Sequence, residues 1–159
     1  MKVDATLTVN GVPYPVEVDP HLSLLKAVRE EIGLTGSKEG CDDSECGACM
    51  MLLDGKPVNA CSFLALQAEG REITTVEGLA SATGDGLTPL QRAFLREGGV
   101  QCGFCTPGML ISATALLRAN PAPSDDEIRL SLAGNLCRCT GYDGIVRAVR
   151  SVADAPDPA

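Results

Sequence analysis

The sequence predicts an α+β protein built from two successive units of different secondary structure. Residues 1–77 contain short segments in which apolar and polar positions alternate, the period of a half-buried strand. Residues 87–159 instead contain helix-capping signals followed by apolar positions at helical spacing. The small, polar stretch at 78–86 separates the two patterns and is expected to be a linker.

The first unit is expected to open with a β-hairpin. Residues 4–9 and 12–18 alternate on either side of Asn10-Gly11, a dipeptide that favours a tight type I′ turn. Pro13 and Pro15 have no amide donor, which predicts that the second strand lies at an edge of the sheet.

Further elements follow in the same unit. A short helix is expected over 23–32, with Ser23 as its N-cap and Gly33 as its terminator. A second hairpin is predicted from 50–53 and 58–60 around an Asp-Gly turn, and one more strand over 73–76.

Four helices are expected in the second unit, and four helices favour a small bundle. Thr88 to Gln91 and Ser124 to Glu127 are capping boxes, which predict helix starts at 89 and 125. Thr106-Pro107 begins another helix, and Thr140 is the candidate cap of the last. The tail after residue 153 contains two prolines and is expected to be disordered.

The eight cysteines fall into two groups of four, and none is left over. Each group can complete a four-thiolate site without a ligand from the other. The first group is Cys41, Cys46, Cys49 and Cys61, and the second is Cys102, Cys105, Cys137 and Cys139.

The first group has the C-x4-C-x2-C…C spacing of plant-type [2Fe–2S] ferredoxins. Its first three cysteines lie in a glycine-rich loop, and the fourth returns from the far side of the second hairpin. Structural zinc is the alternative. Zinc sites usually consist of paired C-x2–4-C knuckles, so the three-cysteine loop favours iron.

The second group is ambiguous at its first pair, because a lone C-x2-C motif is also typical of a redox dithiol. Cys137-Arg-Cys139 supplies a second close pair, which is expected at another helix start. Two such pairs facing each other would form a four-thiolate cavity. A buried two-iron cluster is therefore the better interpretation.

The composition of the chain limits the classes of partner and the cellular compartment that we expect. The net charge is −8 and no basic stripe exists, which argues against nucleic acid. No apolar run approaches a membrane span, and no secretory signal is visible, so a cytoplasmic location is expected. In a reducing compartment, clustered cysteines bind metal more often than they form disulfides. Aromatic residues make up only 3% of the chain, so metal centres are expected to help stabilise its small cores.

Three motifs resemble the small iron–sulfur subunits of the xanthine oxidase family of molybdenum hydroxylases. They are Gly40-Cys-Asp-Asp-Ser-Glu-Cys-Gly-Ala-Cys49, Gln101-Cys-Gly-Phe-Cys-Thr-Pro-Gly-Met109 and Gly134-Asn-Leu-Cys-Arg-Cys-Thr-Gly-Tyr142. The resemblance includes all eight cysteines and covers nearly the whole chain. It implies an N-terminal β-grasp plant-type ferredoxin domain followed by a C-terminal four-helix bundle domain, each with one [2Fe–2S] cluster.

The resemblance also implies a function, an electron-transfer subunit without catalytic residues of its own. The first group would hold the cluster nearer FAD and the second the cluster nearer molybdenum. Gln101 and Cys139 are then the candidate contacts to the molybdopterin, expected as molybdopterin cytosine dinucleotide. The implied partners are a large molybdopterin-binding subunit and a medium FAD-binding subunit. A free-standing two-cluster ferredoxin is the alternative function.

Overall fold

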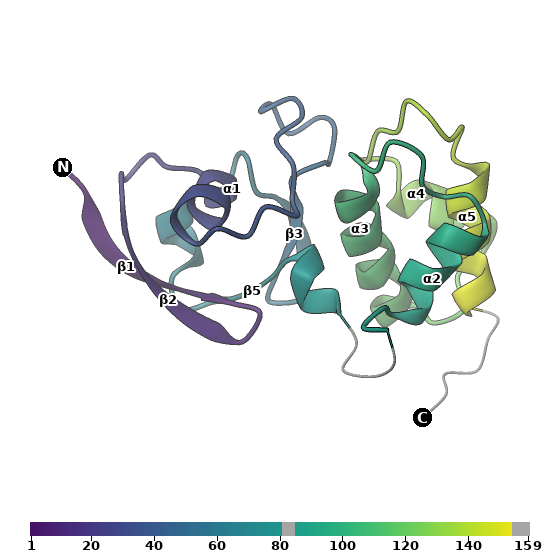
Figure 1. Cartoon of the computed structure of the whole chain (residues 1–159), viewed down its shortest axis with the longest axis horizontal. Helices are drawn as coiled ribbons and strands as arrows, with labels where there is room; N and C mark the ends of the chain where they lie inside the picture. The colour runs from purple at the N-terminus through teal and green to yellow at the C-terminus, as the bar shows by residue number, and fades with distance from the viewer. Residues whose placement is uncertain (81–84, 154–159) are drawn as a thin grey trace.

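The structure, a computed structural model, describes residues 1–80 and 85–153. Its N-terminal half is a five-stranded mixed sheet with short helical segments, and its C-terminal half contains the helices α2 to α5 (Figure 1). The α+β class predicted from the sequence is confirmed.

The sheet has the order β2-β1-β5-β3-β4. β1 and β5 are parallel, and the other neighbours are antiparallel. β2 forms one edge, as its two prolines predicted, and the β1–β2 turn places Asn10 and Gly11 at φ values of 53° and 76°. The strands are β1 Val3–Val9, β2 Val12–Val18, β3 Met50–Leu53, β4 Lys56–Asn59 and β5 Glu72–Thr74.

The helix expected over 23–32 is present but changes its pitch. α1 covers only Leu24–Lys26, and the Ser23 hydroxyl accepts a hydrogen bond from the Lys26 amide at 3.3 Å. The following turn, η1 (Ala27–Glu31), is a π-helix, in which the Ile32 amide reaches the carbonyl of Ala27. The capping signal at Ser23 therefore predicted where the helix begins, but it did not predict that the second part of the helix is a π-helix.

The strand expected over 73–76 ends two residues early. β5 stops at Thr74, and Val76 begins the 3-10 helix η3 (Val76–Leu79). The Asn10 side chain explains the end of the strand, because its Oδ1 accepts from the Thr75 amide and its Nδ2 donates to Thr75 Oγ1, both at 2.9 Å. A second 3-10 helix, η2 (Ala65–Ala68), was not predicted.

The four expected helices are α2 Pro89–Arg96, α3 Thr106–Ala119, α4 Asp125–Ser131 and α5 Asp143–Ala153. Both capping boxes are formed, at the starts of α2 and α4. The prediction that Thr140 caps α5 is wrong, because that helix begins only at Asp143. Thr140 Oγ1 instead accepts from the amide of Tyr142, which has a φ of 70°, and so shapes the turn before the helix.

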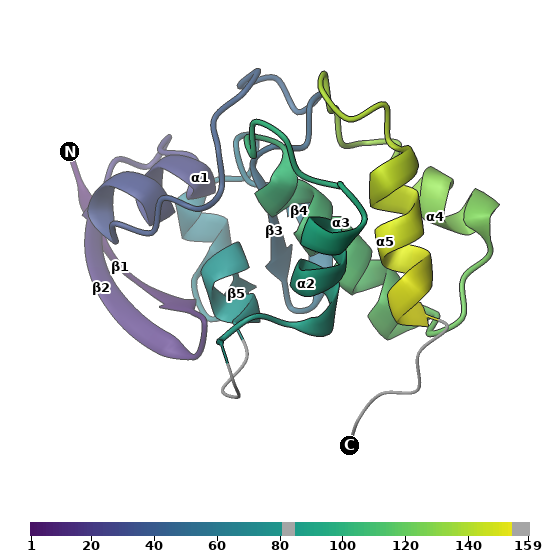
Figure 2. The same cartoon turned by 45° about the vertical axis from the view of Figure 1, so that its right-hand side comes forward.

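The two halves share part of a core. One hydrophobic core lies between the sheet and α1, and a second hydrophobic core lies among α2 to α5. All four residues of β3 are buried, and two of them, Met50 and Leu52, belong to the hydrophobic core of the helices. One face of β3 thus packs against the helices, and α3 runs beside β3 in both views (Figures 1 and 2).

Two expectations concern residues beyond the described ranges. The expected linker, 78–86, begins inside η3, and its residues 81–84 lie outside the described part of the chain. The tail from 154 onward, expected to be disordered, also lies outside it. Within residues 1–80 and 85–153, no helix is both long enough and apolar enough to cross a membrane.

Gly108 on α3 gives a test of how tightly the two halves are docked. A Cβ at this position would lie 2.1 Å from the backbone oxygen of Gly47, which belongs to the first cysteine loop. Gly108→Ala is expected to lower the free energy of unfolding by about 2 kcal/mol, although alanine alone favours a helix by about 1 kcal/mol.

The matched control is Gly134→Ala, since a Cβ there meets nothing within 4 Å. Its free energy of unfolding should stay within about 0.5 kcal/mol of the parent protein in urea titrations. Equal stability of the two variants would contradict the close packing at Gly108.

Candidate metal centres

The first cysteine group comes together in one loop and the strand that follows it. Cys41, Cys46 and Cys49 lie in the loop before β3, and Cys61 lies just after β4. The loop turns sharply, with positive φ values at Asp42, Ser44 and Gly47. As a result, the thiols of this group are neighbours, because Cys46 influences the pKa of Cys41, and both Cys46 and Cys61 influence the pKa of Cys49.

The second group is assembled from two segments of the helical half. Cys102 and Cys105 lie in the turn before α3, with Cys105 in the N-cap position. Cys137 and Cys139 were expected at a helix start, but they lie in the loop between α4 and α5, because α5 begins four residues after Cys139. The four thiols are neighbours, because Cys137 and Cys102 influence the pKa of Cys105 and also that of Cys139.

The four thiols of each group are therefore neighbours of one another. In the part of the chain that the structure describes, no three His, Cys, Asp or Glu side chains converge as ligands of a single ion would. A group of four thiols suits a [2Fe–2S] core, in which each of the two irons takes two cysteine sulfurs. The residues present thus fit the cluster type that the spacing predicted.

Electrostatics differ within the first group. Backbone amides, led by that of Asp43 at 3.3 Å from the sulfur, lower the pKa of Cys41 to about 7. Burial raises the pKa of Cys49 to about 12. An outer thiol is thus prepared as a thiolate, whereas the inner thiol must lose its proton when metal binds.

The second group shows the same contrast. Burial raises the pKa of Cys105 to about 12. Burial also acts on Cys137, but hydrogen bonds from the Thr140 hydroxyl and amide, at 3.0 and 3.4 Å, outweigh it and lower the pKa. At Cys139 the hydrogen bond with Cys102 raises the pKa.

The outer side of the second group is open to solvent. Cys102 and Cys139 are exposed, and Gln101, directly before Cys102, is exposed as well. Two apolar side chains of the same segments are also accessible, Phe104 at 48% and Leu136 at 57%. The exposed thiols are thus accompanied by an apolar surface.

A direct contact joins the two cysteine groups, and the sequence analysis missed it. The Leu136 amide, next to Cys137, donates to the carbonyl of Cys46 at 2.9 Å. The side chain of Asn135 donates to the next carbonyl, that of Gly47, at 3.1 Å. The two pairs of partners are 90 and 88 residues apart, and the only local signal was a polar residue beside the Cys137 motif.

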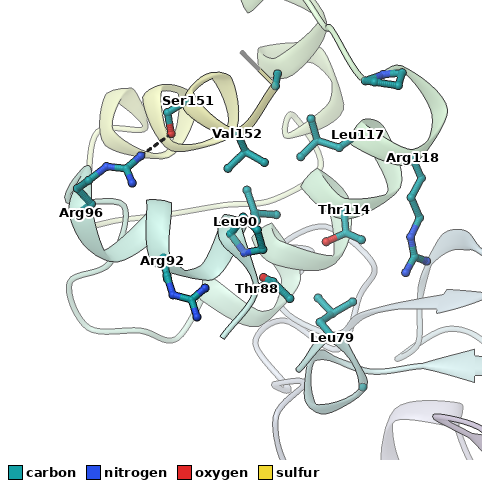
Figure 3. Close-up of a pocket in the computed structure, with 14 residues that line it drawn as sticks. Leu79, Thr88, Leu90, Arg92, Arg96, Thr114, Leu117, Arg118, Ser151 and Val152 are labelled. Atoms are coloured by element: carbon teal, nitrogen blue, oxygen red, sulfur yellow. Dashed lines mark hydrogen bonds between the residues drawn. The ribbon is translucent and has the colours of Figure 1, made fainter. Parts of the chain in front are cut away.

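A separate cavity of about 860 Å³ lies between α2, α3 and α5 (Figure 3). Its lining combines the arginines Arg92, Arg96 and Arg118 with apolar side chains such as Leu90 and Val152, and Arg96 donates to Ser151 Oγ at 2.9 Å. No cysteine is among its 14 lining residues, so this cavity is not part of the candidate metal centres.

Comparison with known proteins shows the family. Residues 7–80 match the model of a 2Fe-2S iron-sulfur cluster binding domain, and residues 75–150 match that of a [2Fe-2S] binding domain. The xanthine dehydrogenase iron-sulfur-binding subunit of Escherichia coli is 48% identical over 145 residues, which cover 89% of each chain. This chain belongs to the small [2Fe–2S] subunits of the xanthine oxidase family.

Solved structures agree with this family. Quinoline 2-oxidoreductase from Pseudomonas putida 86 contains a similar chain, with a TM-score of 0.91 and 49% identity over 96% of this chain and 93% of that one. The solved aldehyde oxidoreductase from Desulfovibrio gigas has a TM-score of 0.88 and 43% identity over 95% of this chain but only 17% of that one. Members of the family therefore occur as separate chains and as part of a longer chain.

Thiol pairing can be tested chemically. Brief oxidation of the metal-free protein should give disulfides within each group of four, because the thiols of one group are neighbours of one another. Peptide mapping by mass spectrometry identifies the linkages. Disulfides that join the first group to the second would contradict the two separate sites.

Proposed function

We propose that this chain carries electrons between a molybdenum active site on a larger partner subunit and FAD or an external acceptor. The observation that carries the proposal is the grouping of eight thiols into two four-thiol sites that lie on either side of one backbone contact. The family and its two cluster-binding domain models support the same role.

The proposed ligands follow from this grouping of the cysteines. Cys41, Cys46, Cys49 and Cys61 would hold the first [2Fe–2S] cluster, and Cys102, Cys105, Cys137 and Cys139 the second. When bound, each cluster supplies a site that accepts and releases one electron. This chain's own amides tune the sites, because hydrogen bonds to cysteine sulfur, such as those from Asp43 and Thr140, favour the more negative reduced state.

The same proposal includes the domain architecture. Residues 1–77 would form a β-grasp plant-type ferredoxin domain, and residues 87–159 a four-helix bundle domain made of α2 to α5. Residues 78–86 would link them. Support comes from the mixed sheet in the first half and the four helices in the second.

Exposure at the second site suits a partner that carries molybdopterin. Gln101 and Cys139 would contact this cofactor, as molybdopterin cytosine dinucleotide on the large subunit, and both are exposed. The accessible side chains of Phe104 and Leu136 would be buried in that interface. A medium FAD-binding subunit would then face the first site, and the complex would reside in the cytoplasm.

Metal analysis tests the cluster assignment. Protein purified without oxygen should contain about four iron atoms and four acid-labile sulfides per chain, the content of two [2Fe–2S] clusters. Elemental analysis and a sulfide assay on one sample measure both. Zinc without sulfide would instead mean a zinc-stabilised interaction module and would refute the electron-transfer role.

Co-purification tests the partner assignment. After gentle lysis of the native cell, a tag on this chain should bring down a molybdenum-containing larger subunit in fixed ratio, visible as one size-exclusion peak. The chain eluting alone with both clusters would contradict the complex and favour a free-standing ferredoxin.

A further inference from the structure

Asn135 is one of four buried polar residues in the described part of the chain, with only 2% of its surface exposed. A buried amide is costly unless its hydrogen bonds are made. Its Oδ1 accepts from the Ser112 hydroxyl of α3 at 2.7 Å, and its Nδ2 donates to the Gly47 carbonyl at 3.1 Å. This side chain therefore connects the helical half to the loop of the first cysteine group.

The backbone beside Asn135 continues the same connection. Leu136 holds the carbonyl of Cys46 at 2.9 Å, so residues 135 and 136 bind two successive carbonyls of the first cysteine loop. There is no spare room at this contact, since a Cβ on Gly47 would lie 2.3 Å from the Gly134 oxygen. The position of one loop thus determines the position of the other.

We propose that Asn135 is a positioning residue that sets the separation of the two clusters and so the coupling between them. The inference rests on the proposed function. Asn135 acts through Gly47, which lies next to Cys46, and through its own loop, which leads directly to Cys137. Its hydrogen-bond partners, Ser112 and Gly47, are not cysteines. An electron passes between the two sites without any bond being made or broken, so distance and relative orientation are what this residue can control.

Low-temperature EPR of the dithionite-reduced holo-protein measures this coupling. Each reduced [2Fe–2S] cluster is paramagnetic, and two such centres held close together split each other's signals. The dipolar part of the splitting falls with the cube of their separation. We expect the wild-type protein to show both signals with this splitting.

Asn135→Asp keeps the side-chain shape but cannot donate to the Gly47 carbonyl, and it places an acidic oxygen against that carbonyl. The splitting should shrink or disappear, while both signals keep full intensity. Ser112→Ala is the milder variant, in which Asn135 loses its anchor on α3, and it should reduce the splitting partially. It also keeps the test decisive if the aspartate variant does not take up both clusters.

Two controls separate positioning from general stability. Asn120→Ala removes an amide whose contacts, to Glu127 and Ala122, stay within the helical half. Phe94→Leu loosens the buried core of α2 and should lower the melting temperature. Neither should alter the splitting.

The inference is overturned if both signals are present and the splitting is unchanged in Asn135→Asp, or in Ser112→Ala where only that variant loads. Wild-type protein with two signals and no splitting would overturn it as well. In each of these cases the proposed function would survive. A wild-type chain with no iron signal at all would refute the proposed function and this inference together.

Discussion

The contact between the first cysteine loop and the helical half is the constraint on which the rest of the arrangement depends. Cys46 and Gly47 present two successive carbonyls, and residues 135 and 136 bind both. A Cβ at Gly47 or Gly108 would collide with backbone oxygen, so this approach requires glycine on both sides. Because each cysteine group continues directly from this contact, the geometry of the two sites is set together rather than separately.

The packing of β3 against both hydrophobic cores also holds the two halves together. β3 is buried on both faces, with Met50 and Leu52 in the core of the helices and Met51 and Leu53 in that of the sheet. The inner thiols lie in this low-dielectric region, and burial raises the pKa values of Cys49 and Cys105. Their sulfurs need metal to carry negative charge there. Metal binding and the docking of the two halves are therefore expected to stabilise each other.

Sequence patterns correctly predicted those structural features that depend on residues close together in the chain. The Asn10-Gly11 turn, the edge position of β2 and the capping boxes of α2 and α4 follow from residues close in sequence. The spacing also predicted two groups of four cluster ligands, and that assignment stays a prediction. Local patterns could not predict the early end of β5, because that end depends on a hydrogen bond between Asn10 and Thr75. They also did not predict that Cys137 lies in a loop rather than at a helix start. The Asn135–Gly47 bond spans 88 residues and has no local signature.

An anaerobic titration with a one-electron reductant tests the central claim most directly. Electrons consumed are counted while the visible absorption of the oxidised clusters bleaches and the EPR signals grow. The account predicts two electrons per chain, one for each four-thiol site, because a [2Fe–2S] cluster accepts one electron. Uptake of no electrons by the fully metallated, folded chain would contradict it, and uptake of one would show that only one site holds a redox-active cluster.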